Sequence, residues 1–373
     1  MRGQQEGHTL TPNPFIIRAI MAPKFYAEHI GSLIRPTSVL ASSLQGLDAK
    51  LRSETLDAAV RHILQTQVEM GITPLTHGEY PHPDSFSAFF DKLKGFEARF
   101  VSLADGFCPE IPVIRGAAAS GLFKGMQCPI ATRKIEWTTF AFEGEWMQIR
   151  RAIASIAEGN SEKEKELLGR VKLTIPSPIV DDPDLTYFCD ETFLSALRED
   201  GFEPDVLLST YLQAHSDATK NCPEGLVMGI HLCRGNFSDD LWLTKGGYEN
   251  IARRLFTETG YDAFFLEYKT EKAGSLEPLR FLPKGMTIVL GLVSTKQSEL
   301  ENLDTLEKKV REAAAVIARE QGRGTLEVLK EQIAVSPQCG FASAEHSKAI
   351  GSEERMWEKL CLMRDLAERI WSM

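Results

Sequence analysis

The stretch Gly225-Leu-Val-Met-Gly-Ile-His-Leu-Cys233 has the pattern of a buried β-strand that ends in two possible metal ligands. Alternate residues of a strand project on the same face, so His231 and Cys233 point toward one spot. Two further strand-like runs end similarly, Phe264-Phe-Leu-Glu267 in a carboxylate and Ser336-Pro-Gln-Cys339 in a thiol. An imidazole, two sulfurs and a carboxylate form a ligand set that suits zinc. The sequence therefore predicts a metal centre at these strand ends.

Apolar runs of strand length alternate with amphipathic helical stretches along most of the chain, which is typical of βα units around a parallel sheet. In a (β/α)8 TIM-like barrel the active site lies at the C-terminal ends of the strands, where the reactive residues of this chain fall. We therefore predict an α/β fold of this kind. Seven strands are recognised, at 25–31, 72–78, 171–176, 225–231, 262–268, 286–292 and 332–338.

Hydrophobic periodicity and turn residues give the remaining organisation. Segments 111–116 and 133–138 resemble a hairpin insertion at about 111–138, because Gly, Ala and Ser crowd the stretch between them. Residues 1–21 are expected to be a disordered extension, and 22–373 a single barrel domain. Apolar stripes at three- and four-residue spacing predict helices at about 54–70, 190–199, 205–219, 247–258, 302–320 and 353–371.

Composition limits the partners and the compartment. The formal net charge of -10 argues against nucleic acid or an anionic membrane as the principal partner. No apolar run approaches the roughly 20 residues that span a bilayer. Seven cysteines without regular spacing argue against a disulfide framework, so a reducing, cytoplasmic setting is predicted. Small-molecule substrates are the partners expected, and the sequence does not indicate an oligomeric state.

Several short motifs resemble one known family. They are His29-Ile-Gly-Ser32, Thr76-His-Gly-Glu79, Thr174-Ile-Pro-Ser-Pro178, His231-Leu-Cys-Arg-Gly-Asn236, Glu267 and Pro337-Gln-Cys-Gly340. Together they are similar to the C-terminal catalytic barrel of cobalamin-independent methionine synthase, and more closely to its short stand-alone relatives. The resemblance covers about residues 22–373. It implies a methyltransferase in which zinc holds homocysteine as a thiolate that takes a methyl group from 5-methyltetrahydrofolate, as a polyglutamate, to give methionine.

The resemblance also implies roles for individual residues. Ile30, Gly31 and Ser32 would lie near the homocysteine backbone, Glu79 would hold substrate, and Asp181 would meet the substrate ammonium. The methyl donor is a tertiary amine that leaves readily only when protonated, so a general acid is required. The candidates are His77 and Glu79, because both lie near a strand end. The zinc ligands implied by the family are His231, Cys233, Glu267 and Cys339.

Two positions depart from the family pattern. Full-length synthases carry a histidine, thought to handle a proton, just after the strand equivalent to 286–292, whereas this chain has Val293-Ser-Thr-Lys296. The acidic pair in Asp181-Asp-Pro183 follows Ser177 by three residues, although two parallel strands need a crossover of about a dozen. One βα unit near residues 178–181 is therefore missing from the expected barrel. Either seven strands close the barrel, another segment is recruited, or the chain is not a competent enzyme.

The chemistry of the predicted ligands separates the possible functions. A free thiol has a pKa near 8.5, and zinc coordination deprotonates it. Two thiolates and one carboxylate around zinc give a formal charge of -1, which suits alkyl transfer to sulfur better than hydrolysis. A His-x-Cys pair alone is more often core packing, but a buried Glu267 between aromatic residues needs a partner. The alternatives are a non-catalytic zinc-binding remnant, a related thiol methyltransferase, and a uroporphyrinogen-decarboxylase-like barrel without zinc.

Overall fold

The computed structural model describes most of the chain in nine stretches. The extension predicted for residues 1–21 lies outside the described residues, so that prediction is not tested. Within the described part, none of the helices is both long and apolar enough to cross a membrane. The described residues are 25–81, 93–102, 125–137, 142–175, 182, 184–234, 244–270, 273–342 and 350–372.

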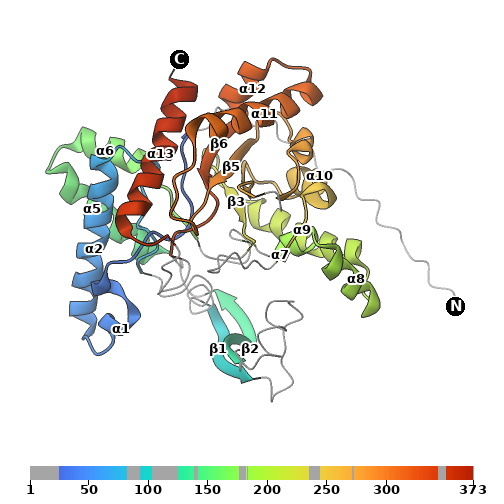
Figure 1. Cartoon of the computed structure of the whole chain (residues 1–373). Helices are drawn as coiled ribbons and strands as arrows, with labels where there is room; N and C mark the ends of the chain where they lie inside the picture. Colours follow the sequence, from blue (N-terminus) through green and yellow to red (C-terminus); the bar gives the residue numbers. More distant parts are fainter. Residues whose placement is uncertain are drawn as a thin grey trace.

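A four-stranded parallel sheet forms the centre of the C-terminal half (Figure 1). Its strands are β3 (Gly229–Leu232), β4 (Ala263–Glu267), β5 (Thr287–Val293) and β6 (Ile333–Pro337), hydrogen-bonded in that order. Nearly every residue of these strands is buried, as expected for parallel strands covered on both faces. The four strands confirm the predicted segments in this half of the chain, and their C-terminal ends lie side by side.

Short segments continue the sheet beyond both edges. Ala27 bridges to Val335 of β6 in parallel, and on the other edge the Asp182 N–H donates to the His231 carbonyl at 2.8 Å. A separate parallel bridge joins Leu75 to Val171. Three predicted strands are thus present as single bridges. Among the described residues the sheet does not close on itself, so the α/β class is confirmed and a closed barrel is not.

Helices follow the strands of the C-terminal half and cover the sheet. Helix α11 is an example of how the sequence produces such a helix. Its buried apolar stripe includes Leu306, Val310 and Ile317. The Asn302 side chain caps its start by accepting a hydrogen bond from the Thr305 N–H. The helices of this half are α10 (Glu249–Glu258), η4 (Glu277–Phe281), α11 (Leu303–Gln321), α12 (Thr325–Gln332) and α13 (Glu353–Trp371).

The N-terminal half is mainly helical: its helices up to Gly169 lie to the left in Figure 1, and those from Asp184 to Thr219 lie to the lower right. Helix α2 packs against α5 through a second hydrophobic cluster that includes Val60, Ile63 and Ile153. Three short helices then lead to β3. The elements are η1 (Thr37–Val39), α1 (Ala41–Leu44), α2 (Ala49–Glu69), α5 (Glu143–Ala157), α6 (Ser161–Gly169), α7 (Asp184–Tyr187), α8 (Glu191–Glu199) and α9 (Pro204–Thr219).

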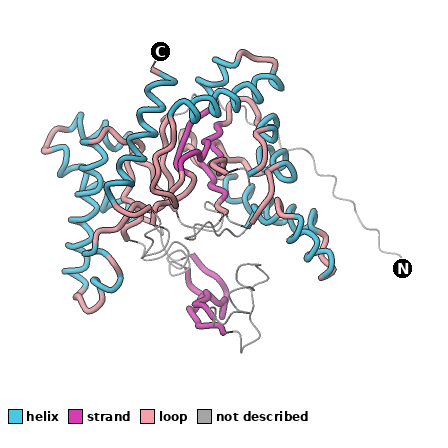
Figure 2. Tube along the Cα trace, viewed as in Figure 1, coloured by secondary structure: helices cyan, strands magenta, loops and turns pink. Residues whose placement is uncertain are grey.

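An antiparallel pair of strands projects below the parallel sheet in Figure 2. It consists of β1 (Leu93–Ser102) and β2 (Gly125–Trp137), with Leu93 opposite Trp137 and Ser102 opposite Gly125. Strand β2 covers most of the predicted segment 133–138. Its partner β1 was not predicted, and the other predicted segment, 111–116, lies outside the described residues. The pair therefore begins earlier in the chain than the predicted insertion.

Candidate metal centre

Four side chains from three strand ends meet at the C-terminal edge of the sheet. One ligand atom from each of the four lies within 4.8 Å of the others, and the two sulfurs are 3.5 Å apart. Three of the side chains are buried and that of Cys233 is partly buried. The structure thus brings together the whole set named from the sequence: His231 and Cys233 at β3, Glu267 at β4, and Cys339 after β6.

The strand register explains why these ends converge. Glu267 on β4 pairs with Gly291 on β5, and Val293 on β5 pairs with Pro337 on β6. A Cβ atom at Gly291 would lie 3.0 Å from the Gln338 Cα and 3.3 Å from the Glu267 Cα. Only glycine leaves room for this approach without movement of the backbone. The close packing holds the ends of β4 and β6 near each other.

Hydrogen bonding orients the His231 imidazole and lowers the pKa of one thiol. The His231 Nδ1 lies 3.2 Å from the Phe265 carbonyl, so its N–H donates there and Nε2 carries the lone pair that a metal requires. The hydrogen bond with Cys233 holds the pKa of Cys339 well below its usual value. The electrostatic contributions of His231 and Lys296 act in the same direction. Cys339 is therefore prepared to serve as a thiolate.

Glu267 is buried beside these sulfurs. Burial first, and then the negative charge of Cys339, raises the pKa of Glu267 to about 7. The Arg234 backbone N–H donates to its Oε1 at 3.1 Å. A thiolate and a carboxylate in one buried site repel each other unless a cation compensates them. One nitrogen, two sulfurs and one oxygen at these separations fit a tetrahedral zinc ion.

The predicted substrate segment lies next to the thiol of Cys339. A Cβ atom at Gly340 would lie 2.7 Å from the Ser32 nitrogen, and the Phe341 N–H donates to the Ser32 carbonyl at 2.7 Å. Gly31 has a φ of +68°, a conformation that favours glycine, and Ile30 is half-buried. The segment from Ile30 to Ser32 therefore packs against the residues that directly follow Cys339.

His77 and Glu79 form a connected pair on the loop after the Leu75 bridge. The Glu79 N–H donates to His77 Nδ1 at 3.1 Å, and His77 Nε2 lies 3.3 Å from Glu145 Oε2. Arg35 also donates to the Glu79 carbonyl at 3.1 Å. Both nitrogens of the His77 ring are thus occupied by protein groups. The structure thus places both sequence-predicted acid candidates together on this loop.

The acidic pair is only partly described. Asp181, the residue expected to meet the substrate ammonium, lies outside the described residues. Asp182 is buried, and its carboxylate accepts from the Asp184 N–H at 2.6 Å and the Leu185 N–H at 2.9 Å. Its other oxygen lies 2.7 Å from His215 Nε2. Asp182 therefore begins α7 and ties it to α9, as the sequence pattern of a helix start indicates.

Two further residues near the centre, Tyr248 and Arg234, are not among those that the sequence analysis named. Tyr248 is fully buried, and its hydroxyl contacts both backbone polar groups of Glu267. Arg234 is buried against the Tyr248 ring. The only sequence signal was the position of Arg234 directly after a predicted ligand. Tyr248 lies far along the chain, so no local pattern could reveal its contact.

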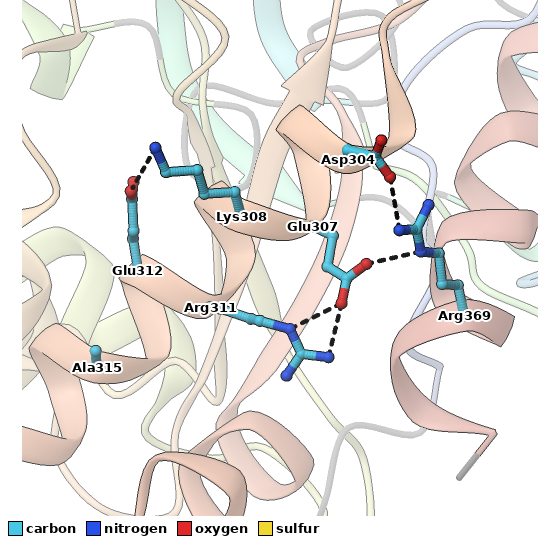
Figure 3. Close-up of a pocket in the computed structure, with 7 residues that line it drawn as sticks. All are labelled: Asp304, Glu307, Lys308, Arg311, Glu312, Ala315 and Arg369. Atoms are coloured by element: carbon cyan, nitrogen blue, oxygen red, sulfur yellow. Dashed lines mark hydrogen bonds and ion pairs between the residues drawn. The ribbon is translucent and has the colours of Figure 1, made fainter.

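A groove on the outer surface has a different character (Figure 3). It lies between α11 and α13, and Figure 3 shows that its charged side chains pair with one another. Arg369 lies 2.6 Å from Asp304 and 2.7 Å from Glu307, which also contacts Arg311 at 2.7 Å. These ion pairs connect the two helices. The groove therefore has the features of a helix-helix contact, and the buried cluster at the strand ends remains the candidate site.

The chain is similar to several known proteins. Residues 190–368 match the family model described as cobalamin-independent synthase, catalytic domain. The chain is 28% identical over 396 residues to the uncharacterized protein YxjH of Bacillus subtilis (strain 168), with 93% of this chain and 95% of YxjH covered. It is 28% identical over 374 residues to the uncharacterized protein YxjG of the same organism, with 94% and 95% covered.

Two solved structures share the fold. A putative vitamin-B12 independent methionine synthase from Listeria monocytogenes matches with a TM-score of 0.59 and 22% identity, over 94% of this chain and 99% of that one. A B12-independent methionine synthase from Shewanella sp. W3-18-1, in complex with selenomethionine, matches with a TM-score of 0.60 and 15% identity, over 93% and 98%. Together these matches define an α/β protein with the fold of those two structures. Its C-terminal half is similar to the catalytic domain of the cobalamin-independent synthase family, the family that its motifs resemble.

Proposed function

We propose that this protein is a zinc-dependent methyltransferase that transfers the methyl group of 5-methyltetrahydrofolate, as a polyglutamate, to the thiol of homocysteine, giving methionine. The observation that carries the proposal is the convergence of four ligand atoms within 4.8 Å at the C-terminal edge of the sheet. The family acts on small molecules, and the net charge of -10 agrees with a small-molecule substrate. The proposed ligands are His231, Cys233, Glu267 and Cys339.

Zinc held by these residues would keep the substrate sulfur as a thiolate at neutral pH. The protein contributes the electron-rich surroundings, because two cysteine thiolates and one carboxylate exceed the charge of the ion by one. Such a site favours attack by sulfur on an alkyl group over activation of water. Both thiols must stay reduced to bind a metal, so we place the protein in a reducing compartment, the cytoplasm.

The remaining residues would bind substrate and move a proton. In our proposal Ile30, Gly31 and Ser32 hold the backbone of the amino acid, and Asp181 meets its ammonium group. Glu79 is the candidate acid that protonates the donor nitrogen as the methyl group leaves. His77 would hold the backbone of Glu79 in place, because its Nδ1 accepts the Glu79 N–H at 3.1 Å. This assignment keeps the acid and the metal on different strand ends.

We further propose that the fold is a (β/α)8 barrel that lacks one βα unit. Parallel bridges join Ala27 to β6 and Leu75 to Val171, and one backbone hydrogen bond joins Asp182 to β3. Only the connection between Thr174 and Asp182 is too short for a crossover. The alignment with YxjH spans 396 positions, more than the 373 residues of this chain, so that relative has segments without a counterpart here.

The short connection also favours a second candidate function, a zinc-binding member of the family that does not turn over. One experiment separates the two: zinc content and methionine formation are measured on purified protein given homocysteine and the methylated folate triglutamate. Zinc with turnover supports the methyltransferase, and zinc without turnover supports the non-catalytic protein. Full activity of Cys233→Ser would contradict both and favour a barrel enzyme without zinc. Cys361→Ser, a free thiol on α13 outside the cluster, is the control.

A further inference from the structure

We propose that Tyr248 and Arg234 are positioning residues of the metal centre: the Tyr248 hydroxyl fixes the backbone of Glu267, and the Arg234 guanidinium is the buried counter-charge of the loaded site. The inference rests on the metal-binding part of the proposed function. It does not require methyl transfer. Neither residue contacts the substrate in this account, because both act through Glu267.

Tyr248 replaces a missing strand partner. Pairing between β3 and β4 ends at Leu232 and Leu266, one residue before Glu267. The Glu267 N–H donates to the Tyr248 hydroxyl at 3.1 Å, and that hydroxyl donates to the Glu267 carbonyl at 3.3 Å. Both backbone groups of the predicted ligand are therefore held by one buried phenol. Without it, the last residue of β4 has no hydrogen-bonding partner on the β3 side.

Arg234 contacts Tyr248 on both its hydroxyl and its ring. Its Nε donates to the Tyr248 hydroxyl at 3.3 Å, and its guanidinium lies 4.5 Å from the centre of the Tyr248 ring. Arg234 is only 5% exposed. Beyond the end of β3 at Leu232, the Cys233 sulfur lies 3.5 Å from the Cys339 sulfur, whereas the Arg234 side chain turns to the Tyr248 ring at the start of α10. The guanidinium thus lies in contact with the support of the cluster.

The charge of Arg234 needs compensation. Its Nη1 and Nη2 atoms are buried and have no oxygen or nitrogen partner in the part of the chain that the structure describes; the neighbouring Cys189 thiol interacts with the guanidinium but brings no fixed negative charge. A buried charge without an opposite charge nearby is costly. Zinc with two thiolates and one carboxylate carries a formal charge of -1. Arg234 is next to this charge, because its backbone N–H donates to the Glu267 carboxylate. The loaded centre and the guanidinium therefore compensate each other, and loss of either should weaken the other.

The test is the affinity of the metal-free protein for Zn2+ and Co2+, measured by chelator competition at one fixed pH. Tyr248→Phe and Arg234→Met should each bind both ions about 10- to 100-fold more weakly. Arg234→Lys should recover part of the loss because it keeps the charge. The Co2+ absorption spectrum of Tyr248→Phe should also shift, since Glu267 is then less well oriented. A general loss of stability would not move that spectrum.

Two controls match the changes. Tyr26→Phe removes a hydroxyl that donates to the Lys330 carbonyl at 2.9 Å, and Arg253→Met removes a guanidinium stacked on Phe281 at 4.2 Å. Both should keep the wild-type affinity and spectrum. Wild-type binding by Tyr248→Phe and Arg234→Met would overturn the inference, as would equal losses in the controls. If Arg234→Met does not fold, Tyr248→Phe decides alone.

The result also distinguishes this inference from the proposed function. A wild-type protein that binds metal tightly but forms no methionine removes the methyltransferase proposal and leaves the positioning roles to be decided by the variants' affinities. A wild-type protein that binds neither Zn2+ nor Co2+ overturns both.

Discussion

The two halves of the molecule differ in how completely their strands pair. From β3 to β6 four strands lie side by side, and every predicted metal ligand belongs to this half. The N-terminal half contributes the bridges at Ala27 and Leu75 and the predicted substrate residues. From this difference we expect the proposed metal binding and the proposed substrate binding to depend on separate parts of the chain. A defect in the first half can stop turnover and leave the metal centre intact.

The largest effect that can test this contrast is loss of a sulfur ligand. Cys233→Ser or Cys339→Ser should lower zinc affinity at least about 100-fold, because a hydroxyl is a far weaker ligand than a thiolate. Zinc per chain after dialysis, measured by mass spectrometry, gives the answer. Cys361→Ser, a free thiol on α13, should keep its zinc. Full zinc content in both ligand variants would contradict this account, because the half that contains β3 to β6 would then not bind the metal.

A change in the N-terminal half should lower methionine formation and leave the zinc content unchanged. Glu79→Gln keeps the size of the side chain and removes its acidic proton, so methionine formation should fall about 100-fold or more. Zinc content should stay at the wild-type level, because Glu79 belongs to a different strand end from the ligands. Parallel measurement of turnover and zinc checks this. If Glu79→Gln loses zinc as well, the two halves are not separable.

Stability of the paired half should depend on a buried ion pair. Glu301, after β5, lies 3.1 Å from the fully buried Lys359 of α13 and accepts the Ser294 N–H at 2.8 Å. Glu301→Gln leaves the Lys359 charge uncompensated and should lower the free energy of unfolding by about 3 kcal/mol. Denaturant unfolding measures the change. Glu312→Gln, in an exposed pair with Lys308, should change it by less than about 0.5 kcal/mol. Equal effects would contradict the assignment.

The smallest expected effect is a change in stability at Asp184, which lies directly after the short connection, at the start of α7. Burial first, and then the charge of Asp182, raises the pKa of Asp184 from 3.8 to about 6. A raised folded-state pKa contributes stability below the unfolded value, and this contribution is lost as the pH rises through about 6. At pH 7 the ionised carboxylate therefore destabilises the fold.

Asp184→Asn should then raise the free energy of unfolding at pH 7 by about 1 kcal/mol, because partial exposure reduces the full linkage value of about 3 kcal/mol. At pH 4 the change should be near zero. Unfolding curves at both pH values test this. A stabilisation that is equal at the two pH values would point to a cause other than ionisation.

The sequence predicted the paired half well because its signals are local. Helix α13 was predicted with its observed bounds, and α11 within one residue, since Asn302 marks the start and the apolar stripe marks the face. The strand at 225–231 was predicted too early: β3 begins at Gly229, and Leu226 and Val227 before it are about half exposed. An apolar run shows that a strand is present but does not show where pairing begins.

Other features arise only from tertiary contacts. Strand β1 alternates apolar with charged residues and is largely exposed, so its sequence lacks the signal of a core strand. The roles of Tyr248 and His215 depend on partners more than 15 residues away in the chain, Glu267 and Asp182. The four metal ligands were predicted because each ends an apolar strand, whereas the groups that hold them have no comparable position.

The most direct test of the central claim is X-ray absorption at the zinc edge of the purified, substrate-free protein. The account predicts one zinc per chain with two sulfur neighbours at about 2.3 Å and two nitrogen or oxygen neighbours at about 2.0–2.2 Å. Cys339→Ser should show one sulfur fewer if it retains any metal. A wild-type protein without stoichiometric zinc, or with zinc that has no sulfur neighbour, would contradict the account.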